Sequence, residues 1–154
     1  MTSIFRVEIS GEPSEILCTQ EEAMEWFECL REEYDDSLDN LENCRLNLAF
    51  LSKSEIQEIN KTFAGKDKPT NVLSFPSSND IREGNFLGDI AICSELIREE
   101  ATSQGKKINH HLIHIFVHGV LHLLGFNHDQ SSNAEKMESL EVRILSKIGV
   151  ADPY

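Results

Sequence analysis

The 154-residue sequence lacks the features that mark membrane proteins, exported proteins and redox proteins. No apolar run approaches the ~20 residues of a membrane-spanning helix. Residues 1–11 contain no basic stretch followed by an apolar one, as a signal peptide would. We therefore expect a soluble, cytoplasmic protein. The cysteines form no C-x-x-C pair, no zinc-cage spacing and no disulfide framework, so we expect them to be reduced packing residues. They are Cys18, Cys29, Cys44 and Cys93.

Basic residues are also scarce, since 14 Lys and Arg oppose 27 Asp and Glu and give a net charge of −13. This balance argues against a polyanionic partner, because proteins bind nucleic acids by neutralising phosphates. The acidity is concentrated in residues 1–60, whose net charge of −11 leaves only −2 for residues 61–154. Lys61, Lys66 and Lys68 cluster in the second part. These lysines form either a local basic rim that receives phosphate or an ordinary solvated loop.

The strongest candidates for functional residues are three histidines, which lie in the segment HGVLHLLGFNH at residues 118–128. His118 and His122 are four residues apart and so share one face of a helix, while Gly125 is the residue most able to end that helix and turn the chain back. His128 would then arrive from another backbone direction. Three imidazoles arranged in this way leave a fourth position open on one ion, as in catalytic rather than structural zinc sites.

The residue after the first histidine bears on the type of reaction. The spacing H-x-x-x-H-x-x-G-x-x-H is that of the metzincin metallopeptidases, which carry glutamate at that position as the general base. This sequence has Gly119 there, and glycine cannot accept a proton. Phosphodiester hydrolysis depends less on a protein base, because a metal ion alone lowers the pKa of its water to about 7. The pattern favours phosphoryl transfer, and a peptidase would need a carboxylate from elsewhere in the fold.

A histidine-rich helix without a metal is the alternative, because His110, His111 and His114 precede the motif. The residues between the motif histidines are apolar, however, and an unpaired imidazole in a buried stretch is costly, which favours a metal site. His114 lies one turn before His118 and could replace His128 as a ligand. Three ligands along one straight helix cannot easily surround one ion, so we interpret His114 as a residue that lines the pocket or supports a ligand.

Hydrophobic periodicity and capping signals predict one α+β domain over residues 1–154, with a mixed four-stranded sheet, about five helices and the histidine helix packed centrally. The expected strands are residues 4–9, 44–51, 71–75 and 87–92. The expected helices are residues 20–34, 53–64, 94–103, 108–124 and 133–148. In the second helix, which a capping box of Ser52 and Glu55 starts, Ile56, Ile59 and Phe63 mark one apolar face.

Two further segments, GKDKPTNVLSFP at residues 65–76 and LGDI at residues 87–90, accompany the histidine motif. With them the sequence resembles the YbeY family of metal-dependent endoribonucleases over nearly its whole length. The resemblance implies one zinc ion held by His118, His122 and His128, and cleavage of single-stranded RNA. It also implies processing of the 3′ end of 16S rRNA and a part in ribosome quality control. The implied partners are rRNA and the ribosome or ribosome-associated proteins.

Two positions depart from the family pattern. The family usually has an arginine, thought to serve catalysis, where this sequence has Ala64. An arginine would hold the scissile phosphate bidentately, so here Lys66 or Lys68 would take part of that role as a point charge. The family also usually has aspartate where this chain has Asn127, which supplies no charge to a ligand. A zinc-stabilised, ribosome-associated binding module with weak or no catalysis is therefore the alternative to an enzyme.

Asp89 is the carboxylate that the sequence singles out, because it lies in a short apolar strand. We expect it either to orient a ligand or assist water, or to cap a turn at the strand end. Ser74 has no histidine or acid at a recognisable motif distance, so nucleophilic catalysis by serine is not indicated.

Overall fold

The computed structural model describes residues 5–34, 44–77, 86–126 and 131–154. The strands are β1 (Arg6–Ser10), β2 (Arg45–Leu51), β3 (Val72–Pro76) and β4 (Phe86–Cys93). The helices are α1 (Gln20–Glu33), α2 (Lys53–Ala64), α3 (Ser94–Gln104), α4 (Ile108–Leu123) and α5 (Ser131–Ile148). The predicted α+β fold is confirmed, and the ends of its elements match the predicted ones or differ from them by at most two residues. None of these helices is long and apolar enough to span a membrane.

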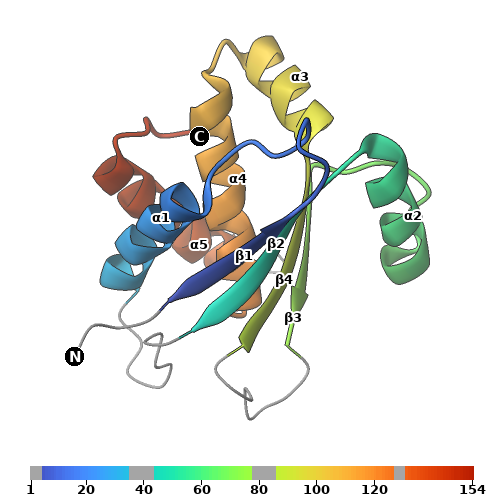
Figure 1. Cartoon of the computed structure of the whole chain (residues 1–154). Coiled ribbons are helices and arrows are strands. Elements are labelled where there is room, and N and C mark those ends of the chain that lie inside the picture. The colour runs from blue at the N-terminus through green and yellow to red at the C-terminus, as the bar shows by residue number, and fades with distance from the viewer. Residues whose placement is uncertain (1–4, 35–43, 78–85, 127–130) are drawn as a thin grey trace.

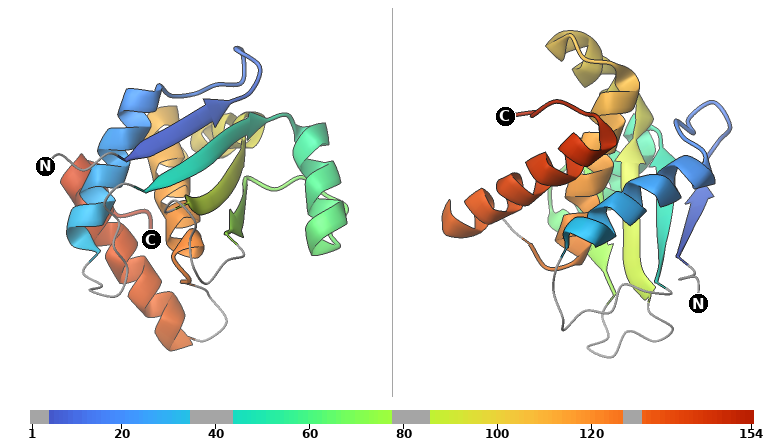
Figure 2. Two further views of the ribbon diagram at one scale, coloured as in Figure 1. Left: turned by 60° about the horizontal axis from the view of Figure 1, so that its bottom comes forward. Right: turned by 90° about the vertical axis from the view of Figure 1, so that its left-hand side faces the viewer.

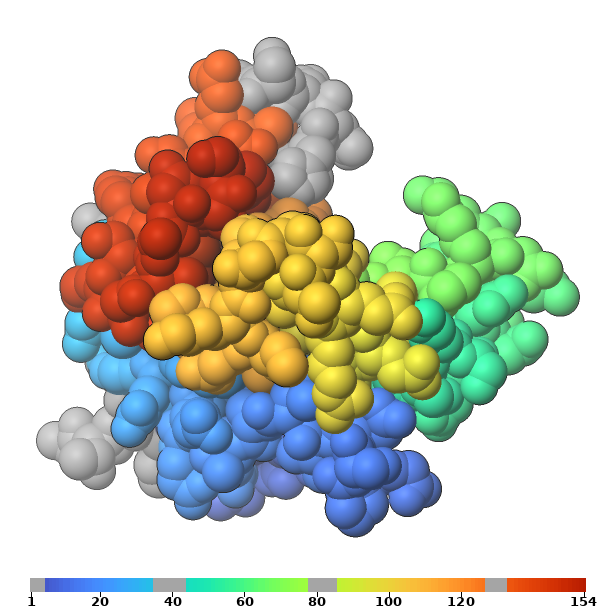
Figure 3. Space-filling view, turned by 90° about the horizontal axis from the view of Figure 1, so that it is seen from above, coloured from blue at the N-terminus to red at the C-terminus, as the bar shows by residue number. Residues whose placement is uncertain are grey.

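One mixed sheet organises the described part of the chain, in the order β1-β2-β4-β3 (Figure 1). Strands β1, β2 and β4 are parallel, while β3 is an antiparallel edge strand. Helices α1, α4 and α5 lie on one side of the sheet, where α1 packs against β1, α4 packs against β3 and β4, and α5 packs against α1 and α4 (Figure 2). Helix α2 packs on the other side and projects from the molecule away from α5 (Figure 3).

Helix α4 forms the centre of the core because its apolar residues face neighbours on several sides. Phe116 is fully buried and contacts Trp26 of α1 edge-on, with ring centroids 5.7 Å apart. On the sheet side, a Cβ atom at Gly119 would lie 3.3 Å from both the Cγ2 atom of Ile90 and the Oγ atom of Ser74. The Ser74 hydroxyl donates to the carbonyl of Gly119 at 3.0 Å. Glycine at this position therefore lets α4 approach strands β3 and β4 closely.

Helix α2 starts at its predicted capping box, in which Ser52 and Glu55 bond reciprocally, and Gly65 caps its end with a φ of +70°. Its predicted apolar face is only partly correct. Ile56 is buried, but Phe63 is 72% exposed and contacts the ring of Phe75 edge-on, with centroids 5.6 Å apart. The last turn of α2 thus reaches the edge strand β3 through this ring contact, while most of the Phe63 side chain stays exposed to solvent.

Candidate functional site

His118 and His122 lie one turn apart on α4, and their Nε2 atoms are 3.0 Å apart. His118 donates from Nδ1 to Oε1 of Glu141 at 2.6 Å. His122 donates from Nδ1 to the backbone carbonyl of Phe126 at 2.9 Å. Because the acceptor at one ring nitrogen decides where the proton resides, both rings carry it on Nδ1. Both Nε2 atoms are therefore acceptors directed at a shared position.

This convergence fits a metal ion. Two acceptor atoms that face each other need a cation between them, since their lone pairs otherwise repel. Tetrahedral zinc with Zn–N bonds of 2.0–2.1 Å holds two imidazole nitrogens about 3.3 Å apart, close to the observed separation. Helix spacing alone brings His118 and His122 to one side of α4. Their Nδ1 partners turn the rings so that both present Nε2.

The turn after α4 forms as the sequence predicts. The helix ends at Leu123, Gly125 has a φ of +101°, and the amide of Phe126 donates back to the carbonyl of Leu121 at 3.1 Å. This turn brings the Phe126 carbonyl to the ring of His122. His128 and Asn127 lie outside the described residues, so the third ligand and the effect of Asn127 stay predictions. The described residues alone contain no group of three metal-binding side chains.

Glu141 on α5 is a site residue that the sequence reasoning missed. Its side chain is inaccessible to solvent, and its Oε2 atom accepts from Nε2 of His114 at 3.2 Å and from the hydroxyl of Tyr154. Burial alone would raise the pKa of Glu141, but the hydrogen bonds from His114, His118 and Tyr154 outweigh it and hold that pKa at about 2. Glu141 therefore stays ionised. The available signal was a glutamate within the apolar stripe of α5, which contains Met137, Leu140, Ile144 and Leu145.

Tyr154, in the segment that follows α5, was also missed. Its ring contacts that of His114 edge-on, with centroids 5.7 Å apart, while its hydroxyl reaches Glu141. Burial of the hydroxyl, together with its bond to Glu141, raises the pKa of Tyr154 above its usual value. His114 thus contacts Glu141 and Tyr154, in agreement with its interpretation as a supporting residue.

A second histidine–glutamate pair lies farther up α4. His111 is buried and donates from Nε2 to Glu100 of α3 at 2.8 Å. Asn71 also donates to Glu100, at 3.1 Å. This pair anchors the start of β3 to helices α3 and α4.

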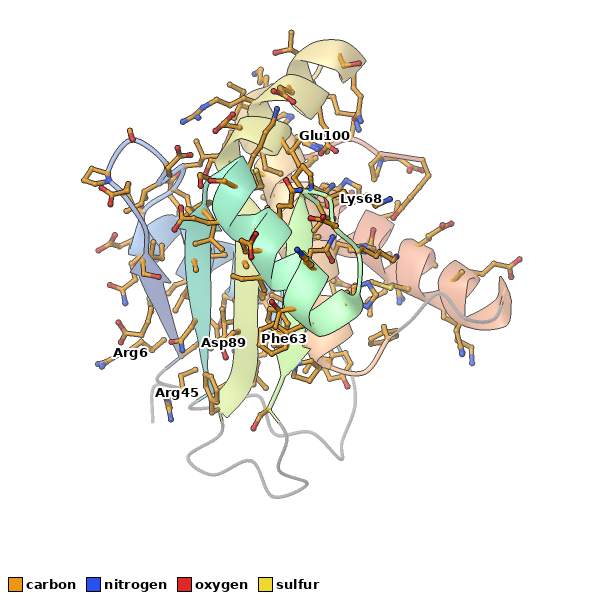
Figure 4. The ribbon with its side chains drawn as sticks, turned by 90° about the vertical axis from the view of Figure 1, so that its right-hand side faces the viewer. Arg6, Arg45, Phe63, Lys68, Asp89 and Glu100 are labelled. Atoms are coloured by element: carbon orange, nitrogen blue, oxygen red, sulfur yellow. The ribbon has the colours of Figure 1, made fainter. Side chains whose placement is uncertain are left out.

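Lys66 and Lys68 are exposed in the loop between α2 and β3. Asn60 of α2 is buried and shapes this loop, because its side chain donates to the carbonyl of Lys68 at 2.9 Å. In the described part of the chain, no hydrogen bond or ion pair involves the amino group of either lysine, and none joins them to α4. Figure 4 shows Lys68 near Glu100, with Phe63 and Asp89 towards the opposite end of the sheet. The substrate-binding role of the two lysines stays a prediction.

Asp89 does not orient the histidines. It is exposed on the side of the sheet that faces α2, where it accepts from the side chain of Asn47 at 2.9 Å (Figure 4). The neighbouring Ile90 points to the opposite side and contacts α4. Because successive strand residues alternate between the two sides, a residue at position 89 cannot reach His118 or His122. The expectation that Asp89 orients a ligand is therefore wrong.

Comparisons with known proteins agree with this arrangement. The family described as Endoribonuclease YbeY matches residues 8–149. A protein named Endoribonuclease YbeY from Francisella tularensis subsp. tularensis (strain WY96-3418) is 45% identical over 120 residues, which cover 75% of this chain and 74% of that protein. Its namesake in Francisella philomiragia subsp. philomiragia is 45% identical over 121 residues, covering 75% and 76%.

A solved structure extends the comparison to the fold. The solution structure of TM1509 from Thermotoga maritima aligns with a TM-score of 0.56 and 26% identity, over 97% of this chain and 98% of that one. The family match spans both the histidine motif's helix and the sheet, and the relatives share nearly half of their aligned residues with this sequence. The chain therefore belongs to the Endoribonuclease YbeY family.

Proposed function

We propose that this protein is a zinc-dependent endoribonuclease that cuts single-stranded RNA. The observation that carries the proposal is the convergence of the Nε2 atoms of His118 and His122, 3.0 Å apart, in a chain of the Endoribonuclease YbeY family. With His128 as the third ligand, one position on the ion stays open for chemistry. When bound, zinc polarises a phosphoryl oxygen and lowers the pKa of its water to about 7.

The residues around the histidines support phosphodiester rather than peptide hydrolysis. Gly119 faces Ile90 and Ser74 of the sheet, so the position of the peptidase base has neither a carboxylate nor room for one. The only carboxylate that the described residues place beside the two histidines is Glu141, which is buried and engaged by three donors.

Lys66 and Lys68 complete the proposal as the groups that receive phosphates of the RNA. Both are exposed, and the structure gives their amino groups no acidic partner among the described residues. An unpaired ammonium group can contact a phosphate without first breaking an ion pair. Such contacts position an RNA backbone without selecting its sequence.

The proposed biological role is maturation of the 3′ end of 16S rRNA and ribosome quality control in the cytoplasm. Its partners would be rRNA and the ribosome or ribosome-associated proteins. Family membership supports this role, since the relatives carry the name endoribonuclease. Single-stranded RNA is the expected form at an rRNA end, where bases are accessible.

Metal analysis of purified variants tests the ligand set. Replacing His118, His122 or His128 with alanine should remove about one equivalent of zinc per chain, because each loss leaves two protein ligands. Replacing His114 should leave most of the zinc. His110→Ala is the matched control, because His110 lies on the same helix outside the cluster. Full zinc content in His128→Ala would contradict the proposed third ligand.

An RNA-cleavage assay with and without chelator tests the activity. We expect cutting of a single-stranded RNA that carries the 16S 3′ end, loss of cutting with chelator or in His118→Ala, and no cleavage of casein. Chelator-sensitive casein cleavage with intact RNA would instead identify a peptidase. A wild-type protein with full zinc occupancy could instead cleave RNA no faster than His118→Ala does. That result would favour the binding module that Ala64 suggests.

A further inference from the structure

Glu141 is held by donors from two separate parts of the chain. His114 and His118 belong to α4, whereas Tyr154 lies in the segment after α5. Glu141 itself has no exposed surface. A buried carboxylate is costly unless it is paired and hydrogen-bonded, so this glutamate requires all of these partners.

The two carboxylate oxygens have different tasks. Oε1 accepts from Nδ1 of His118 at 2.6 Å, a short charge-assisted bond. Oε2 accepts from His114 and from Tyr154. Because His114 and Tyr154 hold one oxygen, the carboxylate plane cannot rotate, and the other oxygen stays aimed at His118.

We propose that Glu141 is a positioning residue for His118, and that Tyr154 and His114 fix Glu141 for this task. The inference rests on the proposed function, because it concerns how His118 is presented to a metal ion. A carboxylate at Nδ1 fixes the tautomer with its lone pair at Nε2 and raises the basicity of that nitrogen. Tyr154 thereby contributes to the metal site without touching the metal.

His122 has a neutral partner at Nδ1, which allows a comparison with the charged partner of His118. The Nδ1 atom of His122 donates to the neutral carbonyl of Phe126, which orients the ring but adds no negative charge. Among the described residues, Glu141 is the carboxylate next to a predicted ligand. Replacing its charge should therefore affect His118 and leave the tautomer of His122 unchanged.

The test uses Glu141→Gln and Tyr154→Phe in the full chain, with Glu135→Gln as control. Glu135 is exposed on the same helix, so this control loses the same charge away from the site. Zinc affinity is measured by competition with a chromogenic chelator. The tautomers of His118 and His122 are read from ¹⁵N chemical shifts of the metal-free proteins, above the pH range in which histidine titrates.

Glu141→Gln should bind zinc about 10- to 100-fold more weakly, the usual effect of losing such a partner. It should also give His118 a mixture of tautomers, because an amide side chain can accept or donate at Nδ1. Tyr154→Phe should weaken zinc binding less. It removes only a hydroxyl group from an exposed residue, so it should not unfold the chain. Glu135→Gln should match the wild type.

Wild-type zinc affinity and a wild-type His118 tautomer in both variants would overturn the inference. Weaker zinc binding with an unchanged His118 tautomer would also overturn it, because the Glu141 side chain would then not be what orients His118. A wild-type protein that binds no zinc would contradict the proposed function instead. The tautomer of His118 in Glu141→Gln would still decide the positioning role, since it is measured without metal.

Discussion

Neighbouring histidines on α4 depend on unlike partners. His118 relies on the side chain of Glu141, while His122 relies on the backbone carbonyl of Phe126. A backbone partner persists whatever side chain is present at its position, but a side-chain partner is lost with a single substitution. Of the two predicted ligands, His118 is therefore the one whose orientation is more sensitive to mutation outside the histidine motif.

Ala64 is a second single residue whose replacement should change the activity. It is exposed at the last position of α2, so an arginine fits there without displacing the core. Ala64→Arg should raise the rate of RNA cleavage about tenfold or more, because a guanidinium group can form two charge-assisted bonds to a phosphate. Single-turnover cleavage measures the effect, with zinc content expected to stay constant.

Ala64→Lys is the matched control for Ala64→Arg, since it adds the same charge without the planar fork. It should give a smaller increase. Equal rates for wild type and both variants would mean that position 64 does not approach the scissile phosphate. If Lys66→Ala then abolishes cleavage, that lysine has taken the role of the arginine.

Cysteine reactivity gives a second prediction for single residues. Burial, and then the nearby Glu22, raise the pKa of Cys18 to about 12. A raised pKa favours the neutral thiol, so only about one Cys18 in ten thousand is a reactive thiolate at pH 8. Iodoacetamide at pH 8 should modify the half-buried Cys29 first, as peptide mass spectrometry would show.

The unfolded protein is the control for the alkylation experiment, since all its cysteines should react at similar rates. The order of modification should reflect exposure, because Cys18 is buried whereas Cys29 is half-buried. Labelling of Cys18 in the native protein as fast as that of Cys29 would contradict the burial of Cys18.

At the scale of elements, the contact between α4 and the sheet determines which chemistry is available. Gly119 lies against Ile90 and Ser74, so Gly119→Glu should not create a peptidase base. A charged side chain forced between α4 and the sheet should instead lower the free energy of unfolding by about 3 kcal/mol or more. Urea unfolding and a casein assay measure the two effects.

Asn109→Glu is the control for this substitution, because Asn109 is exposed in the first turn of the same helix. It should change stability little, since acidic residues near a helix start interact favourably with the helix dipole. A stable Gly119→Glu protein with chelator-sensitive casein cleavage would contradict the assignment of Gly119 to the interface with the sheet.

The distribution of charge is a property of the whole molecule. The chain carries −13 overall, so its affinity for RNA must come from local cations. Replacing Lys66 and Lys68 together with alanine should weaken binding of single-stranded RNA. It should also reduce the slope of log K against log salt by about 1.4, since each phosphate contact on a single strand contributes about 0.7.

The control is the joint replacement of Lys106 and Lys107, which removes the same charge just before α4. Fluorescence anisotropy at several salt concentrations compares the two pairs. If both double variants reduce the slope of log K against log salt by the same amount, RNA binding depends on net charge rather than on the loop that contains Lys66 and Lys68.

Local signals in the sequence were sufficient to predict the elements and part of the site. The capping box of Ser52 and Glu55, the glycines after α2 and α4, and the four-residue spacing of His118 and His122 all act within a few residues. Interactions of this range form in the same way wherever the segment lies in the fold. The sequence therefore determined the helix that carries the histidines and the face that they share.

Only the tertiary structure decided which residues distant in the sequence contact the face of α4 that carries His118 and His122. Glu141 lies 23 residues from His118 in the chain, and one glutamate among 27 acidic residues cannot be chosen by spacing alone. The packing of α5 against α4 places Glu141 beside His118. Asp89 lies on the other side of the sheet, so it cannot contact the histidines. Packing also leaves Phe63 exposed, because whether an apolar helix face is covered depends on what the rest of the chain places against it.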